Sequence, residues 1–220
     1  MSLEWQQFLT TNASAVFGLL GALGAGVLSF FASLMLKRQE FNLQIRSKLL
    51  DRQISAHESI LKLATEMRVM VGRGGVDESG QVRRGPRILL TKNDFEDWFR
   101  RFTDLQLEGS TWLSITTKRE VAFVQDYLVT LNRHLSHVPP DKVFELGERL
   151  RNDFIDLSSS LEKKTFTFFE TGVRKSKLDS LDAWHKYKRS TTERRLSKTA
   201  LLQEIEHFKV TIGGGKPNAS

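Results

Sequence analysis

Two histidines three positions apart, His134 and His137, have a spacing that metal ligands use. The chain contains no cysteine, and no paired carboxylates stand at ligand intervals beside them. Both residues come shortly before Pro139 and Pro140, where exposed loop residues are expected. The sequence therefore predicts loop histidines here, with no metal site and no cofactor.

Paired carboxylates are a second kind of residue that can do chemistry, and Asp94, Glu96 and Asp97 form such a cluster. They fall in the first turn of a predicted helix, where the helix dipole favours negative charge, and this accounts for them without catalysis. The chain has no nucleophile-elbow, zinc-protease, kinase or dinucleotide-binding motif. We expect no catalytic residue and no enzymatic activity.

Arginines in a glycine-rich segment form the third candidate. Residues 72–87 contain five glycines and one proline, and they carry Arg73, Arg83, Arg84 and Arg87. A flexible loop of this kind can bind anionic lipid headgroups, a nucleotide phosphate or nucleic acid, or it can be simply solvated. The glycines do not match the phosphate-binding loop GxxxxGK[ST]. We predict a flexible loop that marks the clearest internal boundary.

A longer basic stretch covers residues 171–200, where nine basic residues face three acidic ones and Trp184 and Tyr187 lie between the cations. The pattern favours contact with an anionic membrane leaflet or phosphate contacts to nucleic acid, and a solvated helical face explains it equally well. Tethering to a bilayer would make lipid contact the easier outcome. The basic residues are Arg174, Lys175, Lys177, Lys186, Lys188, Arg189, Arg194, Arg195 and Lys198.

These candidates are positioned by an apolar segment near the N-terminus. Residues 14–36 form a run of 23 apolar or small residues without a charge, followed at once by Lys37 and Arg38. A helix needs roughly 20 such residues to cross the hydrocarbon core of a bilayer. A cleaved secretory signal has a basic start and a shorter apolar stretch, which this segment lacks. We predict a retained transmembrane helix.

Orientation follows from the basic residues that flank this segment. None precedes it, whereas Lys37, Arg38, Arg46, Lys48 and Arg52 follow it. Because basic residues stay on the cytoplasmic side, residues 1–13 should form a short external N-terminus, with the remainder in the cytoplasm beneath the cell (inner) membrane. The absence of cysteine agrees with a reducing compartment.

The apolar segment also carries small residues at every fourth position. Ser14, Gly18, Ala22 and Gly26 form one ribbon, and Gly21, Ala25, Ser29 and Ser33 form another. Small residues at this spacing let two membrane helices approach closely, which predicts a homo-oligomer. The alternative is that glycine and alanine are simply frequent in membrane helices.

The remaining residues predict an all-α protein. Residues 37–71 predict a juxtamembrane helix, which can be continuous with the transmembrane helix. It carries an apolar stripe that is interrupted by His57 and Arg68. It is either a coiled-coil stalk or a helix packed on the downstream domain.

Residues 88–212 predict an antiparallel cytoplasmic bundle of four to five helices. Capping boxes at Thr91 and Thr117 start two of them, Asp141 caps a long helix that ends at Gly172, and the last helix begins near Thr191. The strand-like sequence TFTFF at 165–169 is read as helix. Phe166 or Phe169 either meets a partner, the membrane surface or another subunit, or is buried against the first helix of the bundle. Residues 213–220 should be a disordered tail.

Together these features predict a single-pass membrane protein whose cytoplasmic helical domain binds another protein or itself, as a scaffold or signal relay. Two alternatives remain open. One is a membrane-perturbing effector of the toxin or defence type, which acts through an oligomerised transmembrane helix. The other is a membrane tether for nucleic acid, formed by the basic stretch 171–200.

Overall fold

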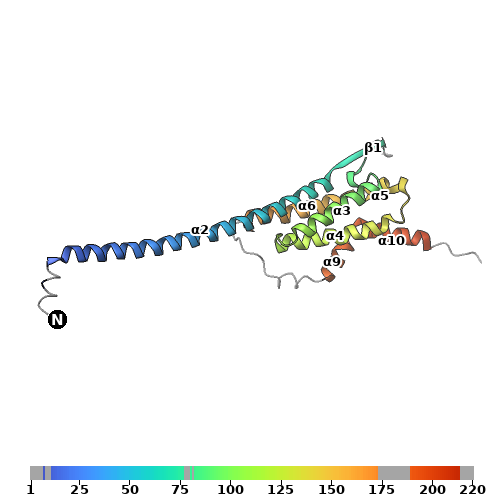
Figure 1. The fold of residues 1–220 in the computed structure, drawn as a ribbon. Coiled ribbons are helices and arrows are strands. Elements are labelled where there is room, and N and C mark those ends of the chain that lie inside the picture. The colour runs from blue at the N-terminus through green and yellow to red at the C-terminus, as the bar shows by residue number, and fades with distance from the viewer. Residues whose placement is uncertain (1–6, 8–10, 77–79, 81, 173–188, 214–220) are drawn as a thin grey trace, which may run out of the picture. The chain divides into compact units, whose positions relative to one another are not determined.

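The computed structural model of this protein is mostly helical and describes residues 7, 11–76, 80, 82–172 and 189–213. The described chain divides into two compact units, Met1–Leu49 and Leu50–Ser220. Figure 1 shows the elements of both units. Of the predicted tail 213–220, Gly213 is the last residue of a helix, and residues 214–220 lie outside the described residues, as do the basic residues between 173 and 188.

Helix α2 runs from Ala13 to Arg68 and includes the apolar segment and most of the predicted juxtamembrane helix. Its last part belongs to the second unit, where Ala56, Ile60, Leu63 and Met67 are buried in the core. Residues 50–68 are therefore a helix packed on the domain. The coiled-coil stalk remains a prediction for residues 37–49 alone.

A β-hairpin follows α2, in place of the predicted flexible loop. Strand β1, Met70–Val76, pairs antiparallel with β2, Val82–Pro86, and an irregularity in register lies between Gly72 and Val76. Main-chain hydrogen bonds form the ladder regardless of side-chain type, so glycine content alone does not exclude strands. Gly85 is buried, and a Cβ at this position would meet the Phe144 ring at 3.3 Å. The hairpin is thus packed on the domain.

The next two helices start at serine or threonine caps. After the short 3-10 helix η1, Arg87–Leu89, α3 covers Lys92–Gly109, and the Thr91 side chain accepts a hydrogen bond from the Asp94 amide as predicted. Helix α4 covers Ile115–Leu135, and its cap is Ser114. The capping box predicted at Thr117 is therefore wrong, because the helix begins before it.

The predicted long third helix is broken. A 3-10 turn η2, Pro140–Lys142, leads into α5, Val143–Arg149, and α6 follows over Arg151–Thr167. Leu150 separates α5 from α6 with φ −85° and ψ 0°, outside the α-helical region. Residues 165–169 are helical as predicted, since α6 continues into the π-helix η3, Phe168–Gly172.

The C-terminal part contains α9, Arg189–Leu196, and α10, Ala200–Gly213. Both pack on the domain: α9 contacts α4, and α10 contacts α6. The predicted single last helix is therefore two helices, and the predicted start near Thr191 or Thr192 lies inside the first of them.

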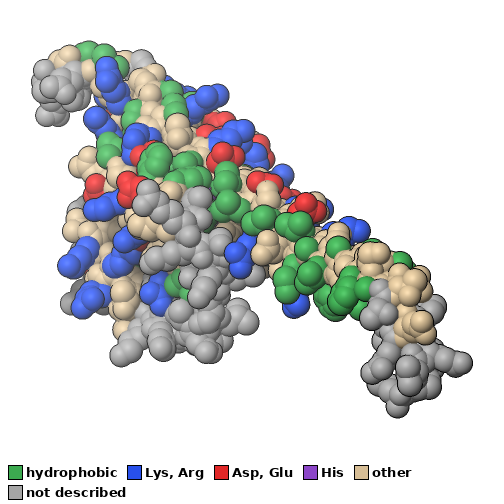
Figure 2. Space-filling view, turned by 90° about the vertical axis from the view of Figure 1, so that its left-hand side faces the viewer, with side chains coloured by type: hydrophobic (Ala, Val, Ile, Leu, Met, Phe, Trp, Pro, Cys, Tyr) green, Lys and Arg blue, Asp and Glu red, His purple; other side chains and the backbone are tan. Residues whose placement is uncertain are grey.

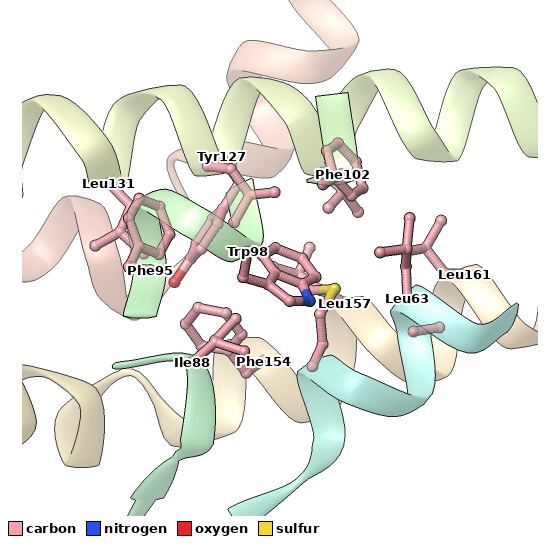
Figure 3. Close-up of a cluster of buried hydrophobic side chains, with 14 of the residues drawn as sticks. Leu63, Ile88, Phe95, Trp98, Phe102, Tyr127, Leu131, Phe154, Leu157 and Leu161 are labelled. Atoms are coloured by element: carbon pink, nitrogen blue, oxygen red, sulfur yellow. The ribbon is translucent and has the colours of Figure 1, made fainter. Parts of the chain in front are cut away.

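One hydrophobic core unites α2, η1, α3, α4, α5, α6 and α10. The aromatic face predicted for α3 supplies Phe95, Trp98 and Phe102, all almost fully buried. Figure 3 shows these rings between Leu63 of α2, Tyr127 and Leu131 of α4, and Phe154 and Leu157 of α6. This core holds the polar groups described below in fixed positions.

Candidate functional site

The apolar part of α2 lies open in the N-terminal unit. Its large hydrophobic side chains are 47–73% exposed between Phe17 and Leu36. Within the described residues, α2 is the one helix long and apolar enough to cross a membrane. Figure 2 shows hydrophobic side chains on the surface of this helix. Lys37 and Arg38 are exposed immediately after the segment.

The two small-residue ribbons lie on this open helix. Gly18, Gly21 and Gly26 have no atom within 4 Å of a Cβ built on them. Ala22, Ala25 and Ser29 are also exposed. Both ribbons are therefore accessible to another helix, which leaves self-association a prediction.

The arginines of residues 72–87 do not form one cluster of free cations. Arg83 forms a two-point ion pair with Glu148 of α5, in which its Nε donates to Oε1 at 3.0 Å. Arg73 donates to the main-chain oxygen of Leu90 at 3.3 Å. Arg84 and Arg87 are exposed. The hairpin thus uses two of its three arginines, Arg73 and Arg83, to attach to the domain.

A polar cavity that sequence reasoning missed lies where α2, η1 and α3 meet. It has a volume of about 470 Å³. Glu66 accepts hydrogen bonds there from Trp98 Nε1 at 2.9 Å and from Arg101 Nη2 at 3.1 Å. No sequence motif marks it, because its residues come from three segments. The lining residues are Glu66, Val69, Arg87, Ile88, Leu90, Asp94, Asp97, Trp98 and Arg101.

Arg195, predicted as part of a basic surface, instead lies in an ion pair between α9 and α4. Its Nη2 donates to Glu120 Oε1 at 2.6 Å and its Nη1 donates to Oε2 at 3.0 Å. The guanidinium carbon also stands 3.7 Å from the centre of the Phe123 ring. Glu120 is only 3% exposed, so Arg195 balances a carboxylate that would otherwise be buried without a partner.

The other described cations of this stretch remain on the surface. Arg189 pairs with Glu193 one turn away, and both side chains are largely exposed. Arg194 and Lys198 are exposed as well. The remaining predicted basic residues, Arg174, Lys175, Lys177, Lys186 and Lys188, lie outside the described residues.

Asp153 of α6 joins three helices through one carboxylate. It accepts hydrogen bonds from the main-chain amides of Ala200 and Leu201 at 3.0 Å each, and so caps the first turn of α10. The Tyr127 hydroxyl donates to the same group at 3.0 Å. Burial, together with the neighbouring Asp153 charge, raises the pKa of Tyr127 well above its usual value of 10.0. Tyr127 is therefore a neutral donor at physiological pH.

His57 is a buried polar residue inside the second unit. Its ring stacks on Phe168 with the ring centres 3.6 Å apart. Nδ1 lies 2.7 Å from the Gln53 main-chain oxygen, and Nε2 lies 3.3 Å from the Ser114 amide nitrogen. Because the amide must donate, Nε2 is the acceptor and the proton is on Nδ1. Burial lowers the pKa of His57.

The two histidines with ligand spacing do not assemble a metal site in the described residues, where no group of three metal-binding side chains gathers. His134 is buried, against the expectation of an exposed loop residue, because it lies inside α4. Burial lowers its pKa, the nearby His137 contributes in the same direction, and Glu204 opposes both. His137 is exposed, as expected.

The described residues bring together ion pairs and caps between helices. Arg149 adds another such link, because it contacts Glu145 of α5 and Glu204 of α10 at 2.7 and 2.9 Å. The candidate functional surfaces are thus the exposed apolar helix and the charged contacts of α9 and α10. Comparisons of the chain with protein-family models, with curated proteins and with solved structures gave no match.

Proposed function

We propose that this chain is a single-pass membrane protein, anchored by residues 14–36, whose helical domain acts as a scaffold or signal relay at the inner face of the membrane. The N-terminus lies outside and the domain lies in the cytoplasm. The protein associates with itself through the ribbon of Gly18, Ala22 and Gly26. It has no enzymatic activity of its own.

The exposure of the apolar segment is the observation that carries this proposal. A water-soluble helix of this composition would bury one face against other elements, yet side chains all around the segment are open. Lipid is the medium that covers such a helix on every side. The basic pair Lys37 and Arg38 supports the orientation, since positive charge is retained on the cytoplasmic side.

An interaction role for the domain is supported by apolar side chains that its own core does not cover. Phe166 of α6 is 53% exposed and Leu107 of α3 is 72% exposed. Single exposed apolar residues are ordinary in monomers. Substitution of these two residues is therefore the first test of whether the domain binds a protein partner.

Cysteine labelling tests anchoring and orientation directly, because the natural chain contains no cysteine. With Ser2→Cys, a membrane-impermeant maleimide should label intact cells, whereas with Ser220→Cys it should label them only after lysis. Both variants should stay in the membrane pellet after carbonate extraction. Leu23→Arg is the control, since a charge at the centre of the segment costs about 3 kcal/mol of insertion free energy and should reduce retention. Release of the parent chain by carbonate would contradict the proposal.

A further inference from the structure

Helices α9 and α10 form a C-terminal arm, residues 189–213, that is attached to the domain by charged and capping contacts as well as by apolar ones. Arg195 pairs with Glu120 on α4, and Asp153 on α6 caps α10 through the amides of Ala200 and Leu201. Arg149 on α5 pairs with Glu204 on α10. The arm thus meets three different helices through polar groups.

The described apolar contacts of the arm come from four residues. Leu201 is fully buried, and Leu196, Ala200 and Ile205 are partly buried against the core. An ion pair between α9 and α4 adds little to docking, because the cost of removing both charges from water nearly cancels their attraction. When the whole arm dissociates from the domain, the charges of Arg195 and Glu120 are both hydrated again. These polar contacts therefore determine the position of the arm on the domain, and they contribute little free energy against its dissociation.

The outer face of α9 and of the turn that follows it is basic. Arg189, Arg194 and Lys198 are exposed, and Glu193 is the one acidic residue of α9. Arg195 would join these cations if it left Glu120. Released, the segment 189–198 presents four cations within ten residues, which suits a surface of clustered negative charge.

We propose that the C-terminal arm is releasable, and that on release it binds the anionic lipid headgroups of the membrane in which the protein is anchored. The Arg195 guanidinium then exchanges the Glu120 carboxylate for lipid phosphate or carboxylate groups. This inference rests on the proposed membrane anchoring. The lipid composition of the membrane would then determine whether the arm covers the surface of α4 and α6 or leaves it exposed.

Spin labels on the full chain in nanodiscs can follow the arm. Ser197→Cys labels the end of α9 and Val129→Cys labels α4, both at exposed positions of a chain without natural cysteines. In phosphatidylcholine discs one short distance population is expected. In discs with 30% phosphatidylserine a longer population should appear. Inorganic phosphate added to phosphatidylcholine discs should not produce it, because the membrane surface is the proposed partner.

Glu120→Gln tests the ion pair between the arm and α4. Removal of the Glu120 charge leaves Arg195, whose side chain is 36% exposed, without its charged partner on α4, so the ratio of released to docked arm should rise about fivefold or more. Glu193→Gln is the matched control, since it changes the charge of the chain by the same amount but breaks only an exposed contact within α9. Asp153→Asn, which weakens the cap of α10, should act in the same direction as Glu120→Gln.

The proposal is overturned if the distance distributions are the same with and without phosphatidylserine, or if Glu120→Gln behaves like Glu193→Gln. Failure of membrane anchoring is a separate result. It would show as a chain that does not insert into discs of neutral phosphatidylcholine, where the arm has no anionic surface to bind.

Discussion

His57 interrupts the apolar stripe of its helix, yet it is fully buried and uses both ring nitrogens in hydrogen bonds. Protonation would place a second donor at Nε2, opposite the donating amide of Ser114. It would also put a positive charge near the N-terminus of α4, where the helix dipole is unfavourable for cations. The neutral ring is therefore part of the packing between α2, α4 and η3.

The free energy of unfolding should fall as pH falls below about 6.5, the ordinary pKa of histidine. The pKa of His57 is lower in the folded state than in the unfolded state. The unfolded state therefore binds more protons in this pH range, and protonation stabilises it relative to the folded state. Thermal unfolding of the detergent-solubilised full chain between pH 7.5 and 5.5 measures this effect. His57→Gln should flatten the dependence by up to about 1.4 kcal/mol per pH unit.

Exposed His137 provides the control for this measurement. His137→Gln should keep the contribution of His57 and lose only the part by which His137 lowers the pKa of His134. Equal slopes for the parent and for His57→Gln would show that His57 does not contribute. His134, whose pKa burial also lowers, contributes to the slope that remains in His57→Gln.

At the scale of elements, the start of α4 depends on Ser114, whose hydroxyl accepts from the Thr117 amide at 3.3 Å. Ser114→Ala should lower the free energy of unfolding by about 1 kcal/mol, the usual effect of losing an N-cap. Ser114→Asp should restore most of it. A neutral result for Ser114→Ala in thermal unfolding would favour a helix start at Thr117.

The contact of α5 with η1 depends on the absence of a side chain at Gly147. A Cβ there would lie 3.0 Å from the Cβ of Leu89. Gly147→Ala should therefore lower the free energy of unfolding by about 1–2 kcal/mol, because the strain exceeds the gain in helix propensity. Gly109→Ala is the control, since its Cβ would meet Ala56 at an ordinary 3.5 Å. Equal melting temperatures for the two variants would contradict this account.

At the scale of the whole molecule, self-association should depend on the face of the apolar helix that carries Gly18 and Gly26. Replacement of both by Leu separates the backbones of two packed helices and should abolish crosslinked dimers in membranes. Gly24 lies in the same segment but on neither ribbon. Gly24→Leu should leave crosslinking unchanged, and loss of dimers in both variants would point to a general effect of leucine.

The sequence predicted the helical class, the apolar segment, the cap at Thr91 and the aromatic face of α3. These depend on local composition and on the periodicity of one helix, which can be read along the chain. It did not predict the hairpin or the break at Leu150. The hairpin depends on main-chain hydrogen bonds, and the break depends on the conformation of one residue. Neither produces a recognisable pattern of apolar and polar side chains.

The role of charged residues was decided by the tertiary structure. Glu120, Asp153 and Arg195 are 33 to 75 positions apart in the sequence, and as isolated residues each fits a solvated helical surface. The structure brings the carboxylates of α4 and α6 against α9 and α10, where the buried Glu120 pairs with Arg195 and Asp153 caps α10. The sequence alone determines an apolar segment and a basic C-terminal region, because both are properties of composition. Only packing decides which cations are held by the domain and which remain at its surface, because that choice depends on which helices meet.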